Sequence, residues 1–261
     1  MKKPSRLRYA YAVGRVRVLE NKLVERAIFS EASEENDFSS AMKVIFDAGS
    51  FSEEMVQIRD SDELDEYLEK EERNLYRLLE EILLEGDILT IFLEESHPEK
   101  AMSVAERTGY SFIKDYIRHK IDLGNIKIFC RLKYSGLSLK KFESLVLKGG
   151  FLDEKVLLQN FDLSFAEIGE RLRATPYHDL WTKATDALEE RETFVELERG
   201  IEDFLMNYLK RAKYIVFGPE PVFTYGLAKR RELSLVRLLG VGKINQIPTP
   251  ILKERISETY V

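Results

Sequence analysis

The chain has 261 residues, 44% of them hydrophobic, and its 46 aspartates and glutamates outnumber its 40 lysines and arginines, which leaves a formal net charge of −6. This amount of apolar sequence can bury the core of one large domain or of two to three small ones. The acidic balance argues against a nucleic-acid-binding protein, because such proteins normally carry a basic excess.

The sequence begins with MKKPSRLRYAYAVGRVRV, which is basic but has no unbroken apolar core, so we expect no signal peptide. No stretch approaches the run of about 18 apolar residues that is typical of a transmembrane helix. Even the apolar run DILTIFLEE is interrupted by Asp87 and Thr90. We therefore expect no direct membrane span, and attachment through another protein if the chain works at a membrane.

Apolar residues recur at helical spacing along nearly the whole chain. Residues 62–86 predict an amphipathic helix that ends at Gly86, and residues 96–109 predict a second helix with a proline near its start. Thr175-Pro176 predicts the start of another helix, and one more follows over residues 194–208.

The stretch YIVFG at 214–218 could form a short strand, although the Gly-Pro pair at its end favours the approach to a turn. No alternating apolar and polar run is long enough to establish a sheet. The fold class predicted from the sequence is therefore all-α.

Three short stretches share an acidic residue and, four positions later, an isoleucine or valine. They begin at Asp87, Asp122 and Glu232. The interval between the first and the second is much shorter than the interval between the second and the third. Aligning Asp122 with Glu232 pairs Leu123 with Leu233, Lys127 with Arg237 and Lys133 with Lys243. This pattern indicates internal repeats, of which the first is shortened.

The Gly-Lys pair at Gly242-Lys243 invites comparison with a phosphate-binding loop. Such a loop needs a serine or threonine after the lysine and a glycine five positions before the second glycine, and the chain has Ile244 and Arg237 at those positions. The preceding residues predict a helix rather than a strand, and a helix C-terminus repels phosphate. The comparison therefore fails.

No other pattern predicts a catalytic or metal site. His97, His119 and His178 are far apart and lack zinc-ligand spacing, and adjacent acidic pairs on a helix point about 100° apart. The single cysteine, Cys130, can form no internal disulfide, and its apolar neighbours predict a buried core thiol. We expect no catalytic residues, no metal and no cofactor, so that binding or mechanical function is favoured by elimination.

The C-terminal segment contains a series of motifs: Gly218-Pro219-Glu220-Pro221, Lys229 to Glu232, Arg237, Gly242-Lys243, Pro248, Glu254-Arg255-Ile256 and Tyr260-Val261. With these motifs it resembles the end of the C subunit family of V-type and A-type ATP synthases, whose member in eukaryotic vacuolar ATPases is called the d subunit. The middle stretch DLGNIKIF with the later Gly-Gly turn, and the opening YAYAVGRVRV, are similar to segments of the same family.

The resemblance implies repeated small helical bundles in a pseudo-symmetric, funnel-like fold. In this family the funnel sits on the membrane rotor ring and receives the foot of the central stalk, and it has no active site or cofactor. The chain is thus expected to be a non-catalytic rotor subunit, cytoplasmic and peripheral to the membrane. It would couple ATP turnover to proton or sodium transport, with no nucleic-acid partner.

The family is usually longer than this chain, and the short first interval and Thr90 in place of an asparagine depart from its pattern. We expect one shortened lobe over residues 1–105 and a second region over 106–261 that carries the second and third repeats.

Polar residues near the repeat turns are candidates for the stalk-facing side: Asn125, Lys127, Arg237 and Lys243. The simpler interpretation is that the charged members are solvated helix-surface groups and that Asn125 is a helix cap. Two other functions stay open. The chain could be a diverged stand-alone helical adaptor outside any rotary ATPase, and nucleotide binding by the isolated chain would favour an enzyme.

Overall fold

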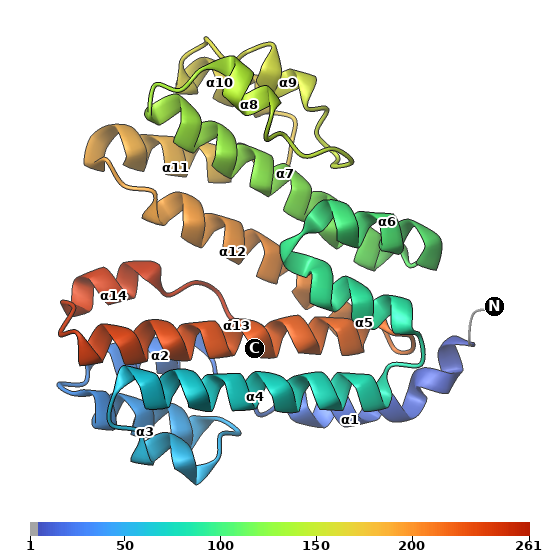
Figure 1. Cartoon of the computed structure of the whole chain (residues 1–261), viewed down its shortest axis with the longest axis vertical. Coiled ribbons are helices and arrows are strands. Elements are labelled where there is room, and N and C mark those ends of the chain that lie inside the picture. The colour runs from blue at the N-terminus through green and yellow to red at the C-terminus, as the bar shows by residue number, and fades with distance from the viewer. Residues whose placement is uncertain (1–4) are drawn as a thin grey trace. The chain divides into compact units, whose positions relative to one another are not determined.

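A computed structural model describes residues 5–261, and over this range the chain is helical and contains no strand (Figure 1). The prediction of an all-α fold is confirmed. The α-helices are α1 (Ala10–Glu20), α2 (Arg26–Glu34), α3 (Phe38–Ala48), α4 (Ser61–Ile82), α5 (Gly86–Leu93), α6 (Pro98–Thr108), α7 (Ser111–Tyr134), α8 (Leu139–Glu143), α9 (Lys155–Leu158), α10 (Phe165–Leu172), α11 (His178–Arg191), α12 (Val195–Lys210), α13 (Glu220–Ile244) and α14 (Thr249–Arg255). Short 3-10 helices lie between them: η1 (Arg6–Tyr9), η2 (Glu53–Gln57), η3 (Glu94–Ser96) and η4 (Arg211–Tyr214).

The chain folds into two compact units. The first unit combines the described part of Met1–Phe92 with Met206–Val261, and the second unit is the continuous stretch Leu93–Leu205. The predicted lobes 1–105 and 106–261 follow sequence repeats rather than packing, and they stay a prediction.

Local signals in the sequence account for several helix ends. α6 has Pro98 in its first turn and ends at Thr108, where the next residue, Gly109, has a φ of +64° that suits glycine. α4, by contrast, ends at Ile82 and Gly86 begins α5, so the predicted stop at Gly86 lies about one turn too late. The possible strand at 214–218 does not form; η4 ends there and an irregular turn follows.

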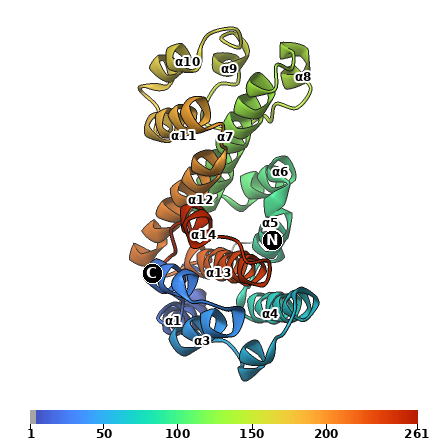
Figure 2. The same ribbon diagram turned by 90° about the vertical axis from the view of Figure 1, so that its left-hand side faces the viewer.

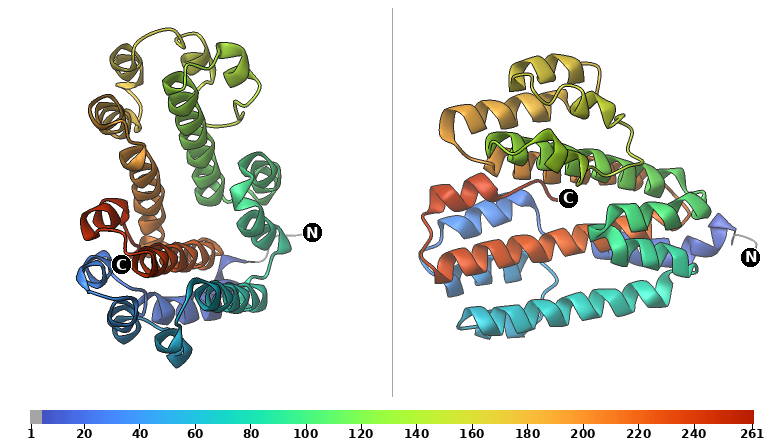
Figure 3. Two further views of the ribbon diagram at one scale, coloured as in Figure 1. Left: turned by 60° about the vertical axis from the view of Figure 1, so that its left-hand side comes forward. Right: turned by 45° about the horizontal axis from the view of Figure 1, so that its top comes forward.

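In the first unit, α13 is the central element. It lies beside α4 and also contacts α1, α2 and α3 (Figures 1 and 2). α14 turns back from the end of α13 and packs on α2, as the red and blue ribbons of Figure 3 show. The apolar side chains between these helices form the core of the unit: Val24, Phe29, Ala32, Ala41, Met42, Ile45, Phe51, Met55, Ile58, Leu64, Tyr67, Leu68, Leu233, Leu235, Val236, Leu239, Leu252 and Ile256.

In the second unit, α7 packs against α6 and α8, and α10 packs against α11. Aromatic rings fill the space around Phe129, whose centroid lies 5.3 Å from that of Phe142 and 5.7 Å from that of Trp181. The indole N–H of Trp181 donates to the carbonyl oxygen of Phe165 at 2.9 Å. Cys130 is buried on α7, the helix that carries Phe129, which confirms the prediction of a core thiol.

The alignment of Asp122 with Glu232 also relates the turn after α7 to the turn after α13. Gly136 and Gln246 both have positive φ, +65° and +55°. The next backbone N–H, of Leu137 or Ile247, donates five positions back along its helix, at 2.9 Å and 2.8 Å respectively. α8 and α14 then begin at equivalent positions, so the two helix–turn–helix segments share one backbone pattern.

Candidate functional site

Two carboxylates of the repeated stretches lie buried halfway along the two longest helices. The first is Asp122 on α7, which is fully buried. Its oxygens accept backbone N–H groups from Phe151 at 2.9 Å and Leu152 at 3.1 Å, and the hydroxyl of Tyr177 donates to Oδ2 at 2.6 Å. Because that hydroxyl has one proton, it accepts from Nδ1–H of His119, 2.8 Å away.

Burial raises the pKa of Asp122 above its ordinary value, although the hydrogen bonds from Tyr177, Phe151 and Leu152 act in the opposite direction. Burial and the neighbouring carboxylate likewise raise the pKa of Tyr177. A tyrosine held neutral in this way is a hydrogen-bond donor rather than a base. The arrangement holds the loop after α8 and the start of α11 against α7.

The Gly-Gly turn of the sequence has a structural cause at this centre. Gly149 has φ +96°, a conformation that side-chain-bearing residues rarely adopt. A Cβ atom on Gly150 would overlap Oδ1 of Asp122. The loop therefore needs glycine at both positions to reach the carboxylate.

The second buried carboxylate is Glu232 on α13, which is 3% exposed. Its Oε1 accepts the backbone N–H of Val24 at 2.7 Å, and its Oε2 accepts from Nζ of Lys229, one turn earlier on the helix. Burial raises the pKa of Glu232, against the lowering effect of the Lys229 ammonium. The Lys-x-x-Glu motif thus joins α13 to the segment after α1.

Asp87, the acidic residue of the shortest stretch, does not share this placement. It lies exposed in the first turn of α5, a helix of eight residues, whereas α7 and α13 have 24 and 25 residues. The stretch at Asp87 therefore matches the other two in sequence, but its carboxylate is not buried as those of Asp122 and Glu232 are.

Lys133 and Lys243, which the repeat alignment pairs, both donate hydrogen bonds to backbone carbonyl groups from the C-terminal ends of α7 and α13. Lys133 donates to the carbonyl oxygen of Phe161 at 2.6 Å. Lys243 donates to the carbonyl oxygens of Ser33, at 2.7 Å, and of Glu35, which lie at the C-terminal end of α2. A lysine at these positions satisfies carbonyl groups that a helix or turn end leaves without partners.

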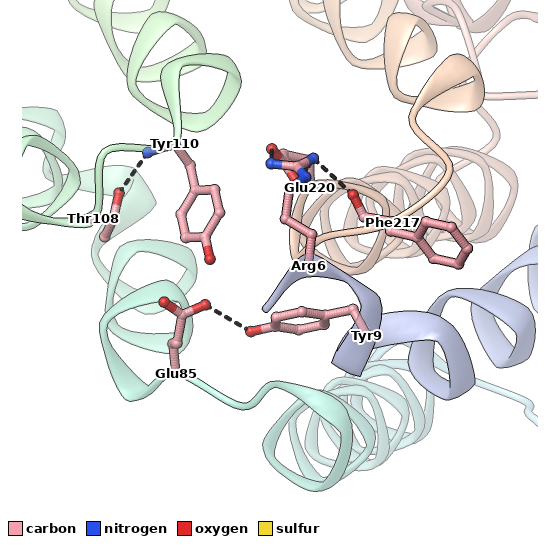
Figure 4. A network of polar contacts seen from close by, with 7 residues as sticks. All are labelled: Arg6, Tyr9, Glu85, Thr108, Tyr110, Phe217 and Glu220. Carbon is pink, nitrogen blue, oxygen red and sulfur yellow. Dashed lines mark hydrogen bonds and ion pairs between the residues drawn. The ribbon is translucent and has the colours of Figure 1, made fainter. Parts of the chain in front are cut away.

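An arginine that lies three residues before the N-terminal family-like motif contacts the C-terminal motif in the first unit (Figure 4). Arg6 donates from both Nη atoms to Glu220, at 2.8 Å and 2.9 Å, and Nη2 also donates to the carbonyl oxygen of Phe217 at 2.7 Å. The Arg6 side chain is half exposed and that of Glu220 is 5% exposed. Gly218 has φ +126°, and a Cβ atom there would lie 2.6 Å from Nη2 of Arg6. The Gly-Pro-Glu-Pro motif and the carbonyl group before it therefore bind the guanidinium group of Arg6.

Tyr9, the first residue of the N-terminal motif, also makes a polar contact in Figure 4. Its buried hydroxyl donates to Oε2 of Glu85 at 3.0 Å and accepts the backbone N–H of Leu84 at 3.2 Å. The contact fixes the segment between α4 and α5 against η1. Within the second unit the same figure shows Tyr110, whose backbone N–H donates to the hydroxyl of Thr108 at 3.3 Å.

The four residues expected on a stalk-facing side lie on α7 and α13. Asn125 is 2% exposed and exchanges two hydrogen bonds of 2.8 Å with the backbone of Leu147. Lys243 contacts the end of α2, as described above. Lys127 and Arg237 are more exposed, at 41% and 50% of their side chains.

Each of the two exposed cations has an acidic neighbour in its own unit. Lys127 lies 3.3 Å from Glu198, and Arg237 lies 3.1 Å from Asp65. Both pairs are open to water, so each contributes little to stability. Their cations can exchange these carboxylates for those of a partner at small cost.

Sequence reasoning did not identify the structural roles of Asp122, Tyr177 and Arg6. The acidic residue of each repeat was visible, but its burial depends on which distant loop reaches it. Arg6 and Glu220 belong to opposite ends of the sequence, and no local pattern links them.

The described residues contain no group of three or more histidine, cysteine or acidic side chains that could hold a metal ion. None of the helices in residues 5–261 is long and apolar enough to cross a membrane. The buried carboxylates are hydrogen-bonded by backbone and side-chain groups of the same chain. They can position helices and present charge, and this is the chemistry that the arrangement supports.

Comparison with known proteins gives one family. The model of the ATP synthase (C/AC39) subunit family matches residues 22–255. The chain is 29% identical over 157 residues to the C subunit of the V-type sodium ATPase of Enterococcus hirae, a match that covers 60% of this chain and 47% of that protein. It is 24% identical over 161 residues to the C subunit of the A-type ATP synthase of Halobacterium salinarum, with 61% of this chain and 46% of that protein covered. It is 27% identical over 157 residues to the C subunit of the A-type ATP synthase of Thermococcus kodakarensis, with 57% of this chain and 40% of that protein covered. The chain thus spans about half the length or less of the curated relatives it matches.

Proposed function

Because the chain belongs to the ATP synthase (C/AC39) subunit family, we propose that it is a non-catalytic rotor subunit of a V/A-type ATPase or ATP synthase. In this role it links the central stalk to the membrane rotor ring and couples ATP turnover to proton or sodium transport. The observation that carries the proposal is the family match over residues 22–255. The chain is then cytoplasmic and held peripherally at the membrane through the complex.

The helix framework supports this proposal on physical grounds. A torque-transmitting subunit must resist shear between two partners, which requires long helices that do not slide along their neighbours. Asp122 and Glu232 each fix a 24- or 25-residue helix at its midpoint to backbone from another segment. Buried, hydrogen-bonded carboxylates at these places oppose sliding because any shift leaves the carboxylate without its donors.

For the partner surface we propose that Lys127 and Arg237 contact the stalk, and that Asn125 and Lys243 brace the helices that carry them. Exposure supports this division. The first two keep about half of each side chain in solvent, whereas Asn125 is buried and Lys243 bonds to carbonyl groups. We also propose that residues 1–105 form a shortened repeat, since the stretch at Asp87 has only the short helix α5.

The test is co-purification with the central stalk and the rotor ring, using Arg237→Asp. We expect the amount of central stalk that co-purifies with this variant to fall at least tenfold. The swap Asp65→Arg with Arg237→Asp restores the internal ion pair and serves as the matched control. Rescue by the swap would mean that only the internal pair matters, and removes Arg237 from the partner surface. Lys127 is tested by Lys127→Glu alone, because Glu198 also pairs with Arg131 at 2.5 Å and a charge swap at Glu198 would break that second pair.

A second candidate function rests on the length of the match. A chain that spans 47% or less of the relatives named above could be a diverged helical adaptor outside any rotary ATPase. A motor subunit is expected beside other ATPase subunits in its genome and in pull-downs from cells that make the complex. Absence of both stalk and ring from such pull-downs would favour the adaptor.

A further inference from the structure

The helix formed by η1 and α1 carries a row of exposed apolar side chains. Leu7, Tyr11 and Val18 are 63%, 72% and 61% exposed, and their spacing of four and seven positions places them on one face. The opposite face is buried, with Val16 at 0% exposure. The helix therefore fills its place in the core with one side and presents a second apolar side to solvent.

A second exposed apolar segment lies beside this helix. In residues 211–217, Tyr214 and Val216 are 88% and 67% exposed. Arg17 of α1 donates to three backbone carbonyl oxygens of this segment, at distances from 2.7 to 3.2 Å, and Arg6 of η1 donates to that of Phe217 at 2.7 Å. These bonds hold the segment against the helix, so both exposed apolar sets belong to one region, which we call the basic apolar face (residues 5–18 and 211–217).

The charge of this face differs from that of the whole chain. Residues 5–18 and 211–217 contain six arginines and lysines and no aspartate or glutamate, in a chain of net charge −6. Three of these cations have no carboxylate within ion-pair distance in the described part of the chain: Arg8, Arg211 and Lys213. The face is thus positively charged around its apolar side chains.

We propose that the basic apolar face binds the surface of an anionic lipid bilayer. Tyrosine and aliphatic side chains bordered by arginine and lysine are the composition of helices and loops that lie in the membrane interface. The apolar side chains protrude singly, which suits insertion between lipid headgroups, and the arginines and lysine around them suit headgroups of negative charge. The inference does not depend on assembly into a rotary complex, and it concerns contact with lipid rather than with protein.

The experiment is flotation of the chain with two kinds of vesicle, one of phosphatidylcholine alone and one of phosphatidylcholine mixed with phosphatidylglycerol. We expect binding to the anionic vesicles only, and its loss when salt is raised, because the attraction to the lipid headgroups is screened. Replacing Arg8 or Arg211 by glutamine should lower vesicle affinity about fivefold for each charge removed.

The apolar contribution is tested with Tyr11→Ser and Tyr214→Ser, whose side chains protrude too far to support the fold. Together they should reduce binding at least tenfold while the far-ultraviolet circular dichroism stays unchanged. The matched control is Leu145→Ser, an exposed apolar side chain outside the face, which should bind like the parent chain.

Three results would overturn the proposal. One is the absence of binding to anionic vesicles at low salt. Another is binding that the tyrosine pair and the arginine variants leave unchanged. The third is protection of Tyr214 by the protein rotor ring, measured by cross-linking, in a preparation in which the chain does not float with lipid.

Discussion

The carboxylate of Asp122 lies so close to Gly150 that a methyl group on this glycine would overlap Oδ1. The two residues come from α7 and from the loop after α8, and the backbone N–H groups that follow the glycine donate to the same carboxylate. The close approach and the hydrogen bonds are therefore one arrangement, which cannot be kept with any larger residue at position 150.

Gly150→Ala is expected to destabilise the chain by about 2–4 kcal/mol, because the added methyl group overpacks the site and moves the N–H donors away from a buried carboxylate. Urea denaturation followed by circular dichroism measures this change. Gly14→Ala is the matched control: position 14 lies inside α1, the added Cβ would meet no atom within 4 Å other than its own chain neighbours and helix backbone, and alanine should stabilise the helix by about 0.5–1 kcal/mol. Equal effects of the two substitutions would contradict the role given to Asp122.

Arg6 and Glu220 should show energetic coupling. Arg6→Ala leaves the buried carboxylate of Glu220 without its bidentate partner, and we expect a loss of about 1–2 kcal/mol, less than for a fully buried pair because the Arg6 side chain is 50% exposed. A double-mutant cycle with Glu220→Gln should give a coupling free energy of about 1 kcal/mol. Additive effects would show that the pair contributes nothing beyond its separate contacts.

Cys130 should be unreactive in the folded chain. Burial raises the pKa of its thiol to about 12, so that roughly one thiol in ten thousand is ionised at pH 8, and the side chain is only 1% exposed. We expect no labelling by a thiol-reactive chromophore under native conditions and one equivalent in concentrated urea. Rapid native labelling would mean that α7 opens frequently around this position.

The pH dependence of stability should differ in sign between two glutamates. Burial raises the pKa of Glu232, so the folded chain binds a proton more tightly than the unfolded chain between the ordinary pKa of 4.5 and the raised value. The stability of the parent chain relative to Glu232→Gln should therefore fall as pH rises through this interval and stay constant above it.

Glu167 provides the opposite case. Its carboxylate accepts from the hydroxyl and the backbone N–H of Ser164 in the capping box of α10, which lowers its pKa below 4.5. Relative to Glu167→Gln, the parent chain should gain stability as pH rises from this lowered value towards 4.5. Urea midpoints measured in steps across the acidic range test both signs, and parallel slopes for the two variants would contradict the assignment.

The sequence predicted what local rules decide. The helices around Pro98 and after Thr175, and the helix that leads up to Gly242-Lys243, were predicted because caps, prolines and apolar spacing act within a short stretch of chain. The end of α4 was placed too late, because Gly86 is a poor helix former that nevertheless begins the next helix.

Long-range contacts could not be found in this way. The sequence identified Asn125 and Lys243 as polar residues near turns, but their bonds to Leu147 and to Ser33 depend on how distant segments pack. The ion pair of Arg6 with Glu220 likewise depends on how distant segments pack. Periodicity reports which face of a helix is apolar, and it contains no information on which backbone donor reaches a carboxylate at its midpoint.

The discontinuous first unit has a consequence for synthesis on the ribosome. Its N-terminal part, up to Phe92, emerges long before α13, which supplies the central helix of the core and the Glu220 partner of Arg6. The second unit is continuous from Leu93 to Leu205 and has its own aromatic core, so it can fold before Met206–Val261, the second part of the first unit, has been synthesised. During that interval Phe29, Met42 and Ile45 lack the apolar cover of α13, and apolar surface exposed in this way makes a partly folded chain prone to aggregate.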